Sequence, residues 1–176
     1  MSEKFAGLEK ALDDVFVKKA PYQLPEKAKK WIVQYSPIIG LVIGVLGLLA
    51  ALGLWNAAHA VNRLVDYANT LSRAYGTGET VKHLSVTFYV AFIALLATSA
   101  VHIIAYPGLK ARSKAKGWNL LFYGALLGLV YDVFNAVYNG SVFGAVWALI
   151  PSVIGLYILF QIRDHYNGKK AASSKK

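Results

Sequence analysis

The sequence predicts an all-α integral membrane protein, a four-helix bundle with an amphipathic N-terminal helix, and three observations lead to this fold class. Hydrophobic residues make up 56% of the 176 residues, which is more than a soluble domain of this size carries. Four apolar runs are long enough to cross a hydrocarbon core of about 30 Å as helices. The charged residues, with a formal sum of +10, lie between or beyond those runs, with one exception.

Residues 1–36 form the predicted cytoplasmic N-terminal region. Within them, residues 2–19 place apolar side chains along one side of a helix, at Phe5, Leu8, Leu12, Val15 and Phe16. The Lys residues of this helix are balanced by Glu and Asp, which weakens its attraction to anionic lipid. Lipid, a protein partner that binds residues 1–20 and the bundle's own cytoplasmic face therefore stay equal alternatives. Pro21 and Pro25 end this helix, and a new one begins at Pro25.

The predicted bundle extends over residues 37–162 and contains the four apolar runs. They are the predicted spans, at residues 37–55, 84–106, 118–138 and 142–162. The aromatic residues expected at the membrane interfaces of the first span are Trp31, Tyr35 and Trp55. Pro107 closes the second span, and Pro151 predicts a kink in the fourth. Residues 139–141 leave room only for a tight turn, so the last two helices are antiparallel.

Residues 56–83 form a predicted amphipathic outer segment. From 56 to 75 they are polar but helically periodic, with an apolar side made of Val61, Leu64, Val65, Ala68 and Leu71. This pattern suits either an extension of the first helix or a separate helix that lies on the outer surface. The Gly-Thr-Gly sequence at 76–78 ends the helix in both cases.

The distribution of Lys and Arg predicts the topology. Sixteen of these residues lie in the N-terminal region, the loop at 107–116 and the basic tail at 163–176, whereas three lie on the other side. The positive-inside rule then places both termini in the cytoplasm of a plasma (inner) membrane. The loop forms a candidate cytoplasmic basic patch, which consists of Lys110, Arg112, Lys114 and Lys116.

Small residues line one face of every span. Examples are Gly40, Gly44 and Gly47 in the first span, His102 among small residues in the second, Gly124 and Gly128 in the third, and Gly144 and Gly155 in the fourth. Lipid gives helices no hydrophobic reason to associate, so close backbone approach must supply the attraction. The stripes predict a tight bundle, and they also suit a homo-oligomer that packs through the same faces.

Asp132 is the only carboxylate inside a span, and with Asn135 and Trp147 it forms a candidate intramembrane polar site. One interpretation is a proton or cation site, because acids at this depth are costly and often functional. The other is a structural acid that accepts a hydrogen bond from the Trp147 indole, which lies at a similar depth. His102 lies about 16 Å away in depth, so we expect it to be interfacial and hydrogen-bonded near Pro107.

The composition argues against several function classes. Cysteine is absent, and neither a phosphate-binding loop nor a serine-nucleophile motif occurs. His59, Asn62, Arg63 and Asp66 form a polar stripe with too few ligands for a metal, and we expect a solvated helix face there. The basic stretches lack interleaved aromatic residues, which argues against nucleic-acid binding. We therefore expect no enzyme activity, no cofactor and no metal.

Two short motifs stand out in the C-terminal third. The start of the third span contains Gly117, Trp118, Leu120, Leu121 and Phe122. The exit from the last span contains Leu156, Tyr157, Leu159, Phe160, Arg163 and Tyr166. In these residues the C-terminal third resembles uncharacterised small bacterial four-span membrane proteins. The resemblance implies a bacterial plasma membrane and no particular activity.

Three functions remain as hypotheses. The leading one is a non-enzymatic scaffold or an accessory, recruiting subunit, because the amphipathic helix, the basic loop and the tail are all expected in the cytoplasm. The alternative is an oligomeric proton or small-ion transporter or channel subunit that uses Asp132. The third is an enzyme that acts on a lipid at the interface, for which His59 and Asp66 are the available residues.

Overall fold

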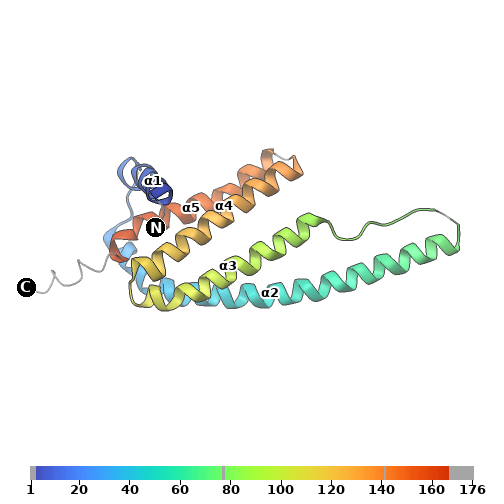
Figure 1. Ribbon diagram of the computed structural model, residues 1–176. Coiled ribbons are helices and arrows are strands. Elements are labelled where there is room, and N and C mark those ends of the chain that lie inside the picture. Colours follow the sequence, from blue (N-terminus) through green and yellow to red (C-terminus); the bar gives the residue numbers. More distant parts are fainter. Residues whose placement is uncertain (1–2, 77, 141, 167–176) are drawn as a thin grey trace, which may run out of the picture.

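The computed structural model describes residues 3–76, 78–140 and 142–166, and most of this part of the chain is helical (Figure 1). The α-helices are α1 (Glu3–Asp13), α2 (Glu26–Ala74), α3 (Val86–Lys110), α4 (Asn119–Asn139) and α5 (Val142–Gln161). The shorter elements are the π-helical turns η1 (Asp14–Lys18) and η2 (Lys114–Trp118) and the 3-10 turn η3 (Arg163–Tyr166). The described residues contain no strand, and the predicted all-α class is confirmed.

Helix α2 has 49 residues and is about 73 Å long, more than twice the thickness of a bilayer core. It runs without a break through the first predicted span and the amphipathic segment that follows. The structure therefore has an extension of the first helix rather than a separate one. Helix α3 runs back along the first part of α2, and α2 projects beyond it (Figure 1). We call residues 56–74 of α2 the arm.

The small face of α2 packs against α3. A Cβ atom added to Gly44 would lie 2.7 Å from Ile103 Cγ1 and 2.9 Å from the Ser99 carbonyl oxygen. A Cβ atom on Gly47 would clash with the Ser99 hydroxyl. Only a residue without a side chain allows the two backbones to approach this closely. The predicted glycine face of the first span is thus a contact within the chain.

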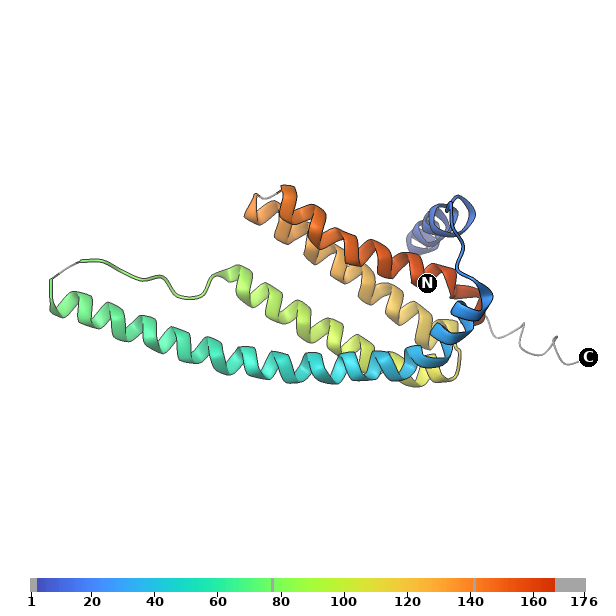
Figure 2. The ribbon, with the colours of Figure 1, turned by 180° about the vertical axis from the view of Figure 1, so that it is seen from behind.

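Helices α4 and α5 form an antiparallel pair, and Gly140 ends α4 in the left-handed conformation, at φ 61°. This pair meets α3 near Gly124, where an added Cβ atom would lie 2.8 Å from Val101 Cγ1. Away from that crossing, the α2–α3 and α4–α5 pairs diverge (Figures 1 and 2). Gly128 and Gly155 accordingly have space around them, with nothing within 4 Å of an added Cβ atom. The expected tight packing along the whole stripe is not found at these two glycines.

The two ends of the bundle differ, and we name them by their packing. The closed end holds η1, η2, η3 and the start of α2, and the open end holds the turn between α4 and α5 (Figure 2). The buried hydrophobic cluster lies at the closed end and consists of Val33, Ala105, Leu109, Trp118, Phe122, Leu156, Leu159, Phe160, Ile162 and Tyr166. This cluster holds the four long helices together at one end.

Two helix boundaries differ from the predictions. Helix α3 continues through Pro107 to Lys110 instead of ending at the proline. Proline removes only its own N–H, and backbone contacts with the start of the next helix hold the turn that follows it. The backbone at Gly108 packs directly against that at Gly117, where an added Cβ atom would lie 2.6 Å from Gly108 C. Near the N-terminus, the π-turn η1 replaces the last turn of the expected helix.

Three helices of the described chain are long and apolar enough to cross a membrane, at Glu26–Ala74, Val86–Lys110 and Lys114–Tyr138. The described part of α5 adds a shorter apolar helix, Leu149–Gln161. Helix α5 is continuous through Pro151, where the sequence predicts a kink. The tail from residue 167 onward lies outside the described residues.

Candidate functional site

The closed end is organised around Trp118, which is fully buried. Its indole Nε1 donates a hydrogen bond to the Leu159 carbonyl oxygen, 2.8 Å away on α5. Its ring stacks on Phe122 and meets the edge of Phe160, each at a centroid distance of 5.3 Å. A buried indole needs a hydrogen-bond acceptor, and α5 supplies one near its end, where helix carbonyls lack partners. Trp118 thus joins α4 to α5.

Tyr166 closes the same cluster from the other side. Its side chain is buried, and its hydroxyl lies 2.8 Å from the Ser36 hydroxyl on α2. Burial raises the pKa of Tyr166 above the usual 10.0, while the bond to Ser36 and the charge of Arg112 oppose that change. Residue 166, which the sequence places in a basic tail, is therefore part of the packed structure.

Acidic residues of α1 bind basic residues of the bundle. Glu9 Oε1 lies 2.6 Å from Lys114 Nζ and 3.4 Å from Arg163 Nη1, and Asp13 Oδ1 lies 3.1 Å from Arg163 Nη2. The two carboxylate side chains are only 11% and 14% exposed. Such partly buried, shared ion pairs are stronger than isolated surface pairs. They fix α1 onto the start of η3 and the start of η2.

Hydrogen bonds from α5 hold the connection between α1 and α2. Gln161 Nε2 donates to the Phe16 carbonyl oxygen at 2.8 Å, and Gln161 Oε1 accepts from the Leu24 N–H at 3.3 Å. Tyr157 donates to the Tyr22 carbonyl oxygen at 2.7 Å. Backbone groups in a segment interrupted by prolines need such partners. Side chains on α5 therefore hold the N-terminal segment through hydrogen bonds.

The apolar side of the N-terminal helix faces the bundle. Leu12, Phe16 and Val17 pack against the buried cluster, whereas Leu8 and Val15 of the predicted stripe are 40% and 54% exposed. The wider π-turn η1 shifts the register, so that Val17 turns inward in place of Val15. Of the three surfaces that the sequence allowed for this helix, the structure has the bundle's own face. The side chain of Phe5 lies outside the described residues.

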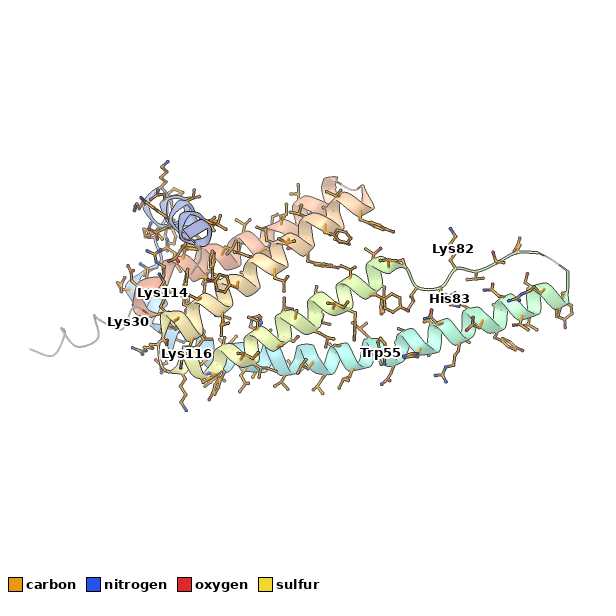
Figure 3. The ribbon with its side chains drawn as sticks, viewed as in Figure 1. Lys30, Trp55, Lys82, His83, Lys114 and Lys116 are labelled. Atoms are coloured by element: carbon orange, nitrogen blue, oxygen red, sulfur yellow. The ribbon has the colours of Figure 1, made fainter. Side chains whose placement is uncertain are left out.

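The basic residues that are free at the closed end differ from those of the predicted basic patch. Lys114 is bound to Glu9 and lies over the Trp118 ring, with its Nζ 5.5 Å from the centroid, so it is not free to bind a ligand. Lys110, Arg112 and Lys116 are exposed and have no carboxylate partner within the described residues. Lys30 adds a further exposed cation at this end of the molecule (Figure 3).

Helix α2 begins beside a shallow apolar groove of about 530 Å³. It is lined by Pro25, Lys27, Ala28, Trp31 and Ile32. The Trp31 ring packs on Tyr35 at a centroid distance of 5.0 Å. An aromatic pair next to exposed lysines is typical of a membrane interface. The groove therefore marks the level at which a bilayer surface is expected.

Asp132 has a different partner from the one predicted. Its Oδ2 accepts a hydrogen bond from the Ser152 hydroxyl at 2.5 Å, which joins α4 to α5. Trp147, the expected donor, is 62% exposed and packs edge-on against Phe143. The expectation for Trp147 was wrong because helical side chains tilt toward the N-terminus of their helix. In an antiparallel pair these tilts point in opposite directions. The residue of α5 that reaches Asp132 is therefore about one helical turn closer to the closed end than depth matching gives, and it is Ser152. Asn135 is half-buried on the next turn of α4.

His102 faces α2 rather than the loop. Its Nδ1 lies 2.8 Å from the Thr98 carbonyl oxygen, and its Cδ2 would be 3.8 Å from a Cβ atom on Gly40. The expected hydrogen bond near Pro107 is therefore replaced by one to the preceding helical turn. His102 fills space at the packing face and stays far from Asp132 along the bundle.

The arm binds the segment that leads back to α3. Asn69 pairs with the backbone of Val81 through both its amide nitrogen and its oxygen, at 3.0 and 2.7 Å. Asp66 Oδ1 lies 2.8 Å from His83 Nε2 (Figure 3 shows His83). Asn62 accepts from the Leu84 N–H and donates to the Tyr89 hydroxyl. The expected solvated face is found at His59, Arg63 and Asp66, which are exposed, whereas Asn62 is half-buried and binds the connection, because a polar side chain can also satisfy the backbone of an irregular segment.

The described residues contain no group of three or more His, Asp or Glu side chains placed to hold a metal ion. Sequence reasoning missed the roles of Glu9, Arg163, Gln161 and Tyr166. A signal was present in the spacing of Glu9 and Asp13, which puts two carboxylates on one side of a helix.

Comparisons with protein-family models, curated proteins and solved structures found no match.

Proposed function

We propose that the protein is a four-span integral membrane protein of a plasma (inner) membrane, with the closed end and both termini in the cytoplasm, and that it acts as a non-enzymatic scaffold or accessory subunit. The three long apolar helices and the apolar part of α5 support the crossings. Large apolar side chains such as Ile38, Leu46 and Val130 are exposed along them, as expected of surfaces that face lipid.

The observation that carries the scaffold proposal is a set of exposed cations at the closed end that the fold leaves unpaired within the described residues. The closed end uses Glu9 and Asp13 to neutralise Lys114 and Arg163, and it leaves Lys30, Lys110 and Lys116 unpaired within the described residues. Cations that the fold does not consume are available to an anionic partner. The chemistry of these cations suits an acidic segment of a partner protein at the membrane surface.

The test measures binding of a Glu-rich fluorescent peptide to the protein in zwitterionic lipid nanodiscs. We expect the double variant Lys30→Gln with Lys116→Gln to bind several-fold more weakly, and salt to weaken binding of the unchanged protein. Lys82→Gln removes one positive charge at the connection to α3 (Figure 3), away from the closed end, and should leave binding unchanged. Equal binding by the unchanged protein and the double variant would remove the support for a scaffold.

A second candidate function is passage of protons or small cations, and Asp132 favours it. Asp132 is only half-buried, and Gly128, one helical turn before it on α4, has nothing within 4 Å of an added Cβ atom. Since four short helices make a poor pore alone, this function requires an oligomer. Proton flux into vesicles that contain the protein should then be lost in Asp132→Asn and kept in Val130→Ala, which shortens an exposed side chain of the same helix. Normal flux in Asp132→Asn, or no flux in any variant, would exclude this candidate.

A further inference from the structure

The arm and Tyr75, the residue after it, carry an apolar seam whose large side chains the bundle leaves exposed. Its members recur with alternating spacings of four and three residues, at Ala57, Val61, Leu64, Ala68, Leu71 and Tyr75. Leu64 is 68% exposed and Tyr75 is 81% exposed. At about 100° per residue, the centre of the seam lies about a third of a turn around α2 from the Asn62 and Asn69 side chains that hold the connection to α3.

The arm cannot place this seam on the bilayer surface. It continues the predicted membrane helix without a break, and residues 54–75 contain neither glycine nor proline to bend it. If α2 crosses the membrane, the arm stands out into water by about 28 Å at 1.5 Å per residue. An apolar face in water is stabilised by burial against another protein surface.

The spacing identifies the kind of surface. An alternation of four and three is the heptad pattern of a coiled coil, in which two helices wind around each other with a repeat of 3.5 residues. Val61 and Ala68 occupy one core position and Leu64 and Leu71 the other, and Leu at this second position with a β-branched residue at the first favours two strands. The alanines allow a close approach of the two helices.

We propose that the arms of two copies of this chain pair through the seam as a parallel two-stranded coiled coil outside the membrane. Copies in one membrane share their orientation, so their arms are parallel, as a two-fold axis along the membrane normal requires. The seam and its exposed flank, formed by Ala60, Tyr67 and Ala74, carry no charge that would repel a second copy. On the other flank, Ala58 and Val65 are buried within the chain. The inference rests on the membrane topology of the proposed function.

Cysteine cross-linking tests this pairing without background, because the chain contains no cysteine. A disulfide requires Cα atoms about 4.4–6.8 Å apart. In membranes treated with a mild oxidant, Leu64→Cys and Leu71→Cys should give several-fold more covalent dimer than Arg63→Cys and Thr70→Cys, which lie off the seam. Adding Leu64→Lys to the Leu71→Cys chain should remove that dimer, since two lysines would then face each other.

Equal cross-linking at all four positions, absence of a dimer, or a covalent product only with another protein would each overturn the paired arms. The membrane proposal is judged separately, by extraction of the same membranes with alkaline carbonate. A chain that resists extraction but gives no seam-specific dimer contradicts the pairing and leaves the proposed function standing. A chain that carbonate releases contradicts the membrane proposal itself.

Discussion

The closed and open ends of the bundle are built from the same helices but are held in different ways. At the closed end, Trp118 and Phe160 are buried, and hydrogen bonds and ion pairs fix the N-terminal segment to α5. Toward the open end, Val137 and Trp147 are exposed and Gly128 has free space beside it. Small residues occur along both. The difference teaches that small residues permit close packing, whereas large buried rings and directional contacts decide where it occurs.

The largest expected effect separates two tryptophans. Trp118→Ala removes a fully buried ring and should lower the free energy of unfolding by about 3–5 kcal/mol. Trp147→Ala removes an exposed ring near the open end and should change it by less than about 0.5 kcal/mol. Unfolding in mixed micelles, followed by circular dichroism, measures both. Equal losses would show that the two ends do not differ in packing.

The next effect compares two helical glycines. An added Cβ atom at Gly108 would lie 2.1 Å from backbone atoms of Lys116, so Gly108→Ala forces the backbone apart and should cost about 1–3 kcal/mol. At Gly128 the added atom meets nothing, and Gly128→Ala should be neutral or stabilising by up to about 1 kcal/mol. The same unfolding measurement decides. A stable Gly108→Ala protein would contradict the close crossing of α3 and η2.

A smaller effect concerns the attachment of α1. Arg163→Ala leaves the partly buried Glu9 and Asp13 with fewer partners and should cost about 1–2 kcal/mol. Lys18→Ala removes a pair with Asp14 whose members are 62% and 40% exposed, so no measurable loss of stability is expected. Hydrogen exchange should show faster exchange of the α1 amides in Arg163→Ala alone. Unchanged exchange there would mean that other contacts hold α1.

The smallest effect depends on pH. Burial raises the pKa of Tyr166, so the folded state favours the neutral hydroxyl. The resulting stability is fully present below the usual tyrosine pKa of 10.0 and is lost as the pH rises through the higher folded value. Tyr166→Phe should therefore lose less stability than the unchanged protein above about pH 10. Parallel losses in both proteins would show that the buried hydroxyl does not contribute.

The helices were predictable from sequence because their signals are local. Apolar run length and proline position located α2 to α5 within a few residues, and the unbroken periodicity after Trp55 allowed for the arm. The continuation of α3 beyond Pro107 was not predictable in this way. It depends on the contact between Gly108 and Gly117, which only the folded chain brings together.

The candidate site was predicted less well, because it depends on distance and direction. The net charge of α1 is close to zero, and this sum does not show that Glu9 and Asp13 bind Arg163 specifically. Matching residues by depth gave Trp147 as the partner of Asp132, and the tilt of side chains along a helix gives Ser152 instead. The small-residue stripes do not indicate that the α2–α3 pair and the α4–α5 pair separate.

The most direct test of the account determines which side of the membrane each end occupies. Single cysteines replace Lys116 at the closed end, Thr70 on the arm and Tyr138 near the turn between α4 and α5, and intact cells are treated with a maleimide that does not cross membranes. We predict labelling of Thr70→Cys and Tyr138→Cys in intact cells and of Lys116→Cys only after lysis. Labelling of Lys116→Cys and Tyr138→Cys from the same side would contradict a bundle of four spans.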